Sequence, residues 1–248
     1  MANFVRRSFI AIFGICAIVW AIDVIVIYRA ESSLAGTAQG ILSGEKFSSA
    51  QLSAMKRRLD ATPARPLQSS ALSGAAIIRL LLLEDELKPG NRPPSSSDLA
   101  DLQTIVSAVL AQSPVNSFVW LTDLWLKRLR GESAESDLNL LRMSYWSGPN
   151  EAWIAVRRNP LALGIFPSLS NDLAEHALTE FAGLVRSGLY EDASNILAGP
   201  GWAIHERLLS RLVQVDEADR RGFARVLRSK DLDGVTVPGQ EERPSRPF

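Results

Sequence analysis

The chain has 248 residues, and its 27 basic side chains balance its 27 acidic ones. This balance, without clusters of Lys or Arg, argues against a nucleic-acid-binding protein. The single cysteine, Cys16, excludes an intrachain disulfide, and the lack of alternating Val-rich and Thr-rich runs predicts that strands are absent.

The N-terminal segment is the most apolar part of the chain. Arg6 and Arg7 precede an almost unbroken apolar run over residues 8–28. A helix of that length rises about 1.5 Å per residue and spans roughly 30 Å, which matches the hydrocarbon core of a bilayer. The sequence therefore predicts a tail over 1–7 and a transmembrane helix over 8–28. About 200 residues remain outside the membrane, enough for one helical domain or two small ones.

The charges around this run predict its orientation. Arg6 and Arg7 precede it, whereas the bases after it are interleaved with acids over residues 29–46, which we expect to form a linker. The positive-inside bias then keeps the tail in the cytoplasm and directs the body to the periplasm. A cleaved signal peptide is the alternative, because residues 36–38 resemble a cleavage site. The length of the apolar run and the charges between it and that site argue against cleavage.

Asp23 is the one ionisable side chain within the predicted span. A carboxylate deep in lipid costs about 2.5–3.5 kcal/mol on insertion scales unless it finds water or a partner. Two interpretations stay open. Asp23 lies five residues before Tyr28 and can reach wet headgroups, or it contacts a polar group on another membrane helix beside Ala17 and Ala21, which have the spacing of a helix-packing motif.

Beyond the linker, short amphipathic helices separated by Pro, Gly and Ser are expected over residues 47–229. A capping box from Ser48 to Gln51 opens the first. Apolar residues at helical spacing and the intervening breakers predict the rest. The expected helices run from 48 to near 63, and over 70–87, 98–112, 116–130, 133–145, 149–158, 170–187, 190–198, 202–213 and 216–229. Residues 160–167 break the pattern, and 230–248 are predicted to be a flexible tail.

The hairpin expected over 116–145 carries a distinctive set of residues. A large residue, a Leu, a small residue and an aromatic lie at fixed steps on its first helix, and an Ala and two apolar residues follow on the second: Phe118, Leu121, Thr122, Trp125, Ala134, Leu138 and Leu141. This set resembles a tetratricopeptide unit, in which small residues let the helices approach and large ones fill the groove. Residues 186–193 resemble the turn of another unit. The resemblance implies an all-α body built as a degenerate array of helical hairpins.

The order of elements also resembles a loosely defined group of bacterial proteins. In that group an Arg-bearing tail and one span precede a Pro-Leu-rich entry, here residues 64–67, and then tetratricopeptide-like hairpins. Its members are associated with cell-envelope polysaccharide assembly. The resemblance therefore implies protein partners in the cell envelope, an inner-membrane location, and a link to polysaccharide synthesis or export.

The motifs of common enzyme classes are incomplete. His205-Glu206 lacks a second histidine four positions on, where Leu209 stands, so no zinc helix is expected. Gly131-Glu-Ser133 resembles the Glu-Ser pair of lytic transglycosylases, but it lies in a hairpin turn and lacks their downstream motif. His176 lies beside Glu175 and can pair with it locally. We therefore expect no catalytic residue, no metal site and no cofactor.

Aromatic and basic residues leave further alternatives open. Trp146, Trp153 and Trp202 are expected to pack in the core, and a sugar-binding groove is the other interpretation. Arg157 and Arg158 are expected to be a solvated helix end, where cations complement the helix dipole.

The sequence as a whole predicts a membrane-anchored periplasmic scaffold or adaptor for a cell-envelope assembly, without an enzymatic activity of its own. The alternative is a glycan-binding or glycan-cleaving module that uses the tryptophans and Glu132. A solenoid does not dictate its ligand, so the partner stays open.

Overall fold

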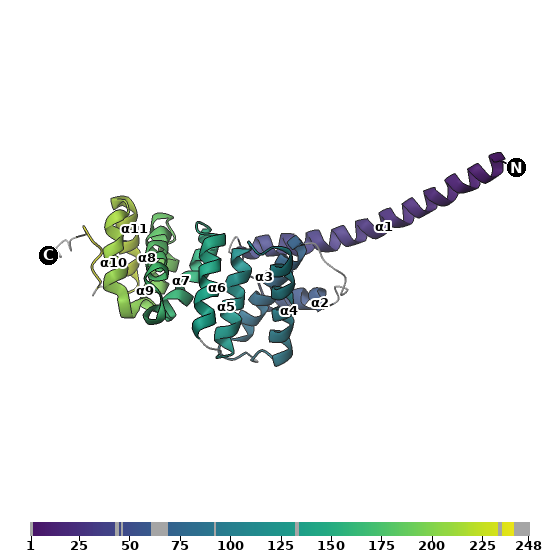
Figure 1. Ribbon diagram of the computed structural model, residues 1–248. Coiled ribbons are helices and arrows are strands. Elements are labelled where there is room, and N and C mark those ends of the chain that lie inside the picture. The colour runs from purple at the N-terminus through teal and green to yellow at the C-terminus, as the bar shows by residue number, and fades with distance from the viewer. Residues whose placement is uncertain are drawn as a thin grey trace. The chain divides into compact units, whose positions relative to one another are not determined.

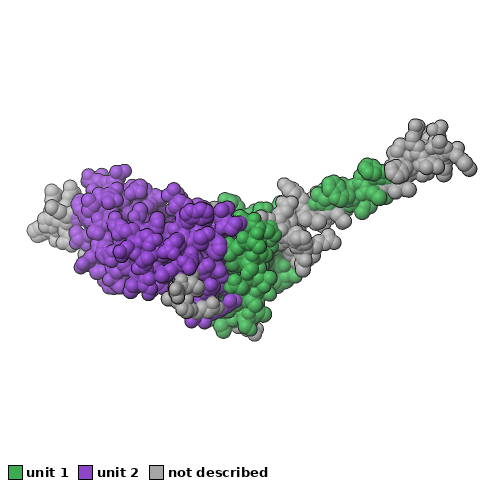
Figure 2. All heavy atoms as spheres, in the orientation of Figure 1, with its two compact units in different colours: residues 1–113 green, residues 114–248 purple. Residues whose placement is uncertain are grey.

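The computed structural model describes residues 2–42, 45, 47–60, 69–91, 93–131, 134–232 and 235–240, with the side chains of 2–12, 23, 26–31, 69 and 134–136 excepted. The described residues form α-helices and short 3-10 turns, with no strand among them. The predicted all-α class is therefore confirmed. The chain divides into two compact units, residues 1–113 and 114–248, which Figure 2 colours green and purple.

Unit 1 is built around a helix that is apolar on nearly all sides. Its helices are α1 (Ala2–Leu42), α2 (Ser49–Asp60), α3 (Ser69–Glu86) and α4 (Ser96–Gln112). Helix α3 contacts the other three, and its apolar run buries Ala76, Ile78 and Leu83 completely or nearly so. A helix that is hydrophobic all round needs neighbours on several faces, and here α1, α2 and α4 provide them.

Helix α1 continues past the predicted span (Figure 1). The prediction of a linker over 29–46 is wrong for residues 29–42, because Leu34, Ala38 and Ile41 recur on one helical face and are buried. Gly74 of α3 marks the close approach of the two helices, since a Cβ there would lie 3.1 Å from the Leu34 carbonyl oxygen. The end of α1 is therefore a packed part of unit 1.

Two helix starts among the described residues carry a box of reciprocal hydrogen bonds. Ser48 N–H donates to Gln51 Oε1 at 2.7 Å, and Gln51 N–H donates back to Ser48 Oγ at 3.4 Å, which confirms the predicted capping box. A second box joins Ser95 and Asp98 at the start of α4. This box explains why α4 begins at Ser96, two residues before the predicted start.

Unit 2 holds the remaining helices: α5 (Ser117–Leu129), α6 (Ala134–Ser147), α7 (Ala152–Gly164), α8 (Asn171–Arg186), α9 (Tyr190–Ala198), α10 (His205–Arg211) and α11 (Glu217–Ser229), with 3-10 turns η1 (Phe166–Ser168), η2 (Trp202–Ile204) and η3 (Leu212–Gln214). Helices α5 and α6 pack side by side (Figure 1). Phe118, Leu121 and Leu141 are buried as the hairpin pattern predicts. The side chain of Ala134 lies outside the described residues.

Helix α7 differs most from the prediction. It includes Pro160, whereas the sequence predicts a short helix over 149–158 and a break over 160–167. Proline removes one backbone N–H and usually kinks or ends a helix. Here Ala162 and Leu163 beyond the proline are buried, and this burial offsets the lost bond.

Residues 235–240 contact α11. Val237 is buried, and Arg220 Nη1 donates to the Pro238 carbonyl at 2.6 Å. The predicted flexible tail over 230–248 is therefore wrong for residues 235–240. Residues 241–248 lie outside the described residues.

Candidate functional site

Arg158 is a fully enclosed charge in unit 2. Its side chain is 0% exposed, on a face of α7 that also carries Ile154 and Ala162. Nε and Nη2 bond Glu180 Oε1 of α8 at 2.8 and 2.7 Å. Nη1 donates to the Ser144 carbonyl at 2.7 Å, where α6 nears its end, and Nη2 donates to the Gly148 carbonyl at 3.1 Å. One guanidinium therefore joins three successive helices.

The carboxylate of Glu180 has several donors. Tyr145 Oη donates to Oε2 at 3.0 Å, and Asn159 Nδ2 donates to the same oxygen at 3.3 Å. The Arg158 guanidinium also lies 4.1 Å from the centroid of the Tyr145 ring. Burial raises the pKa of Glu180, and the charge of Arg158 opposes that rise. Burial, with the Glu180 charge, raises the pKa of Tyr145 well above its usual range, so its hydroxyl stays a donor.

A cleft of about 370 Å³ lies over this cluster, between α8 and the start of α7. Its α8 wall is one helical face, because His176, Thr179, Glu180, Gly183 and Ser187 recur at spacings of three and four. The opposite wall holds Pro149, Asn150, Ala152 and Ala155. Small residues on both walls leave the space open, and a Cβ at Gly183 would meet no atom within 4 Å.

The rim of this cleft, the α7–α8 cleft, carries His176. Its ring is exposed and stacks on Tyr145 with 5.1 Å between centroids. The neighbouring Glu175 bonds Arg211 of α10. The predicted local pairing of His176 with Glu175 is thus replaced by a ring contact and a longer-range ion pair.

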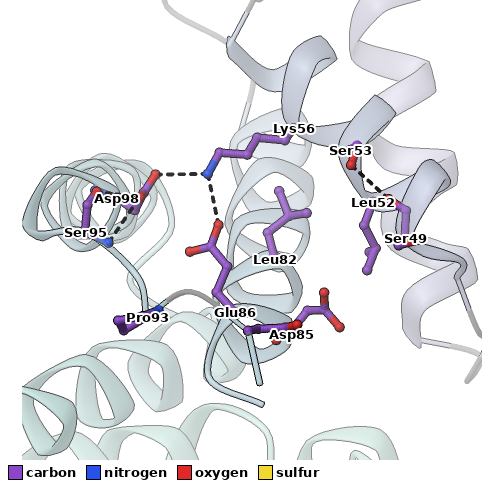
Figure 3. A pocket seen from close by; sticks show the side chains of 11 residues that line it. Ser49, Leu52, Ser53, Lys56, Leu82, Asp85, Glu86, Pro93, Ser95 and Asp98 are labelled. Carbon is purple, nitrogen blue, oxygen red and sulfur yellow. Dashed lines mark hydrogen bonds and ion pairs between the residues drawn. The ribbon is translucent and has the colours of Figure 1, made fainter. Parts of the chain in front are cut away.

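Unit 1 has a cleft of similar size, about 390 Å³, shown in Figure 3. Lys56 of α2 extends between two acids, with Nζ 3.0 Å from Glu86 Oε1 and 3.4 Å from Asp98 Oδ1. The hydrogen bond to Glu86 raises the pKa of Lys56, and the Ser95 hydroxyl lowers the pKa of Asp98. Each of these charges is already balanced by a neighbour.

A second cation, Arg79, holds the same three helices together. Its Nη1 lies 3.0 Å from Asp60 Oδ1 at the end of α2, and its Nη2 lies 2.7 Å from Asp101 Oδ2 of α4. The side chain of Arg79 is largely buried, but both carboxylates are exposed. This contact fixes the packing of α2, α3 and α4.

Several residues singled out in the sequence cannot be placed. Glu132, Ser133 and the side chain of Asp23 lie outside the described residues. His205 does have a placement: its Nδ1 lies 2.7 Å from the Trp202 carbonyl oxygen, and its ring stacks on Trp202 at 4.7 Å between centroids. His205 thus interacts within its own turn.

The tryptophans divide between core and surface. Trp153 packs on Phe118 with 5.2 Å between centroids, in line with the expected core role. Trp146 and Trp202 are 69% and 47% exposed, so the prediction that they pack in the core is wrong. Neither lines the α7–α8 cleft.

The prediction of a solvated helix end is wrong for Arg158, because α7 continues to Gly164 and encloses the side chain. A signal was present in the sequence. Arg158 follows Ile154 and precedes Ala162 by four positions each, so it lies within the apolar stripe of the helix. An arginine inside such a stripe needs buried partners, and Glu180 is the main one.

Comparison with known proteins yields no match to a family model, a curated protein or a solved structure. Within the part of the chain that the structure describes, no helix has the length and apolar character needed to cross a bilayer. The run over 8–28 is only partly included, since the side chains of 8–12, 23 and 26–28 are outside that part.

Proposed function

We propose that this chain is a single-pass inner-membrane protein whose helical body acts as a scaffold or adaptor in the periplasm. Residues 8–28 serve as the anchor, with the N-terminus in the cytoplasm. The body, a degenerate array of tetratricopeptide-like hairpins, serves a cell-envelope assembly of polysaccharide synthesis or export. In this role the chain binds protein partners and carries out no catalysis.

The continuity of α1 is the observation that best supports this proposal. In its first part Phe13, Ile15 and Trp20 are exposed, although they are large and apolar. In its last part, where α1 packs on α3, Leu34 and Ile41 are buried. Contiguous exposed apolar surface marks a segment with another environment to contact, and lipid suits this one. One helix thus serves both as anchor and as part of the folded body.

Topology reporters fused after Phe248 test the address. A reporter enzyme that is active only in the periplasm should be active, and one that is active only in the cytoplasm should be silent. Exchanging Arg6 and Arg7 for glutamate should weaken the periplasmic signal, because it removes the charges that hold the tail inside. The reverse pattern of activity would refute the proposed address.

Glycan binding is a second candidate function, supported by the amide, hydroxyl and charged side chains of the α7–α8 cleft and by the exposed rings of Trp146 and Trp202. Aromatic faces suit the apolar faces of sugars. The two functions are compatible, because a scaffold of a polysaccharide assembly can bind the polymer as well as its protein partners.

A further inference from the structure

The α7–α8 cleft offers an unbalanced positive charge. Its charged and titratable lining residues are Tyr145, His176, Glu180 and Arg186, and the raised pKa of Tyr145 keeps that hydroxyl neutral. The negative charge of Glu180 is neutralised by its ion pair with the buried Arg158, and both of its carboxylate oxygens accept hydrogen bonds. Among the described residues, no carboxylate lies within ion-pair distance of Arg186. The cleft is therefore suited to a ligand that carries an anionic group.

The remaining polar lining is uncharged and can both donate and accept. Asn150 lies on one wall, and Thr179 and Ser187 lie on the other, all three exposed. Amide and hydroxyl side chains combine donor and acceptor atoms, as the hydroxyl groups of sugars do. The apolar part of the lining is formed by Pro149, Ala152, Ala155, Leu184 and the Tyr145 ring, against which the apolar face of a sugar ring can lie.

The cleft is elongated along α8. From His176 to Ser187 is eleven residues, about 16 Å along the helix axis at the standard rise. An isolated phosphate or carboxylate ion would fill only a small part of that length. An oligosaccharide that places one acidic group at Arg186 and its hydroxyls along the rest of the cleft matches both the length and the distribution of polar groups.

We propose that the α7–α8 cleft binds an acidic saccharide. Arg186 pairs with the sugar carboxylate, and Asn150, Thr179 and Ser187 bond its hydroxyls. Gly183 provides the space for the sugar ring at the centre of the α8 wall, where it has no side chain. This proposal deepens the proposed function and rests on it only for the class of polymer.

Calorimetric titration of the purified full chain with tri-galacturonic acid tests the proposal. Gly183→Leu should abolish binding, because its side chain would occupy the cleft. Arg186→Gln should weaken binding about tenfold, through loss of a charge-assisted pair. The matched controls are Gly164→Leu, at another α-helical glycine with no atom within 4 Å of an added Cβ, and Arg228→Gln, which removes an arginine of α11. Both controls should bind within about twofold of the original chain.

Competing probes decide the ligand class. Maltotriose is neutral, inorganic phosphate lacks hydroxyl-bearing rings, and a tri-glutamate peptide carries carboxylates on a peptide backbone. Equal binding of any of these would overturn the assignment to an acidic saccharide. So would absence of tri-galacturonic acid binding, or equal loss in the control variants. The topology reporters give an independent readout, so a failed titration with an active periplasmic reporter refutes the saccharide proposal and leaves the anchored scaffold standing.

Discussion

Each unit has an arginine whose ion pairs and hydrogen bonds connect three helices. In unit 2 both partners of the ion pair are buried, whereas in unit 1 the carboxylate partners are exposed to solvent. In unit 2 the Arg158 side chain is 0% exposed and its partner Glu180 is 6% exposed. In unit 1 the Arg79 side chain is 10% exposed, but its partners Asp60 and Asp101 are 51% and 56% exposed. The contacts are alike in length, so solvent access is what distinguishes them.

This difference in exposure determines how much each arginine contributes to the free energy of unfolding. Breaking a buried pair leaves an uncompensated charge away from water, whereas exposed partners regain their hydration when the cation is removed. We therefore expect unit 2 to depend strongly on its arginine and unit 1 only weakly. Because the Arg158–Glu180 ion pair is buried, it can hold α7 and α8, the two walls of the α7–α8 cleft, in place.

The largest effect is expected for Arg158→Met. The change strands Glu180 in the interior and also removes donors from the Ser144 and Gly148 carbonyls. The free energy of unfolding of unit 2 should fall by about 3–5 kcal/mol, the usual cost of breaking a buried pair. Denaturant titration of the full chain measures it. The double variant with Glu180→Leu should recover part of the loss, and no recovery would mean that the carboxylate is not the stranded group.

Tyr145→Phe should have a smaller effect in the same cluster. It removes the hydroxyl that donates to Glu180 Oε2 at 3.0 Å and keeps the ring that faces Arg158. A buried carboxylate that loses one donor should cost about 1–3 kcal/mol in the same denaturant titration. An unchanged unfolding midpoint would show that water replaces the hydroxyl or that the existing Asn159 bond suffices, and Glu180 would then be better hydrated than its burial indicates.

Much of the fold follows from local patterns in the sequence. The helix over 190–198 matches α9, and the box from Ser48 to Gln51 opens α2 as predicted. These features depend on residues a few positions apart, where spacing and capping chemistry determine structure. The failures occurred where distant burial overrides a local signal. Pro160 lies within α7, and residues 29–42 are helical, because tertiary packing supports both.

The candidate site was less predictable than the fold. Its defining contact joins Arg158 to Glu180, 22 residues apart, and single-sequence periodicity gives no pairing between separate helices. His176 was recognised as a polar residue, but its contact with Tyr145 depends on how α6 packs on α8. Arg186 and Gly183 were not identified as site residues, since a cation in the last turn is an ordinary feature of a helix end and a single glycine within a helix gives no sign of a cleft.

Arg79→Met tests the ion pairs of unit 1, whose carboxylate partners are exposed. The exposed carboxylates of Asp60 and Asp101 can be hydrated once the cation is gone, so the expected loss is about 1 kcal/mol or less in the free energy of unfolding. The same titration used for Arg158→Met measures it. A loss of stability as large as that of Arg158→Met would contradict this expectation, because solvent exposure would then not determine how much each arginine stabilises its unit.

The smallest effects are expected in the pH dependence, where the two units should differ in sign. The pKa of Asp98 is lowered by the Ser95 hydroxyl, so its contribution to stability is present above its ordinary value of 3.8 and is lost as pH falls through the folded pKa. The pKa of Glu180 is raised by burial above its ordinary value of 4.5, so stability declines as pH rises from 4.5 through the folded pKa. Asp98→Asn should remove the first dependence and Glu180→Gln the second, in unfolding curves recorded from pH 3 upward. Matching pH profiles for the two variants would show that burial does not separate the two acids. If only Glu180→Gln removes the decline in stability above pH 4.5, that decline is due to the buried carboxylate of Glu180.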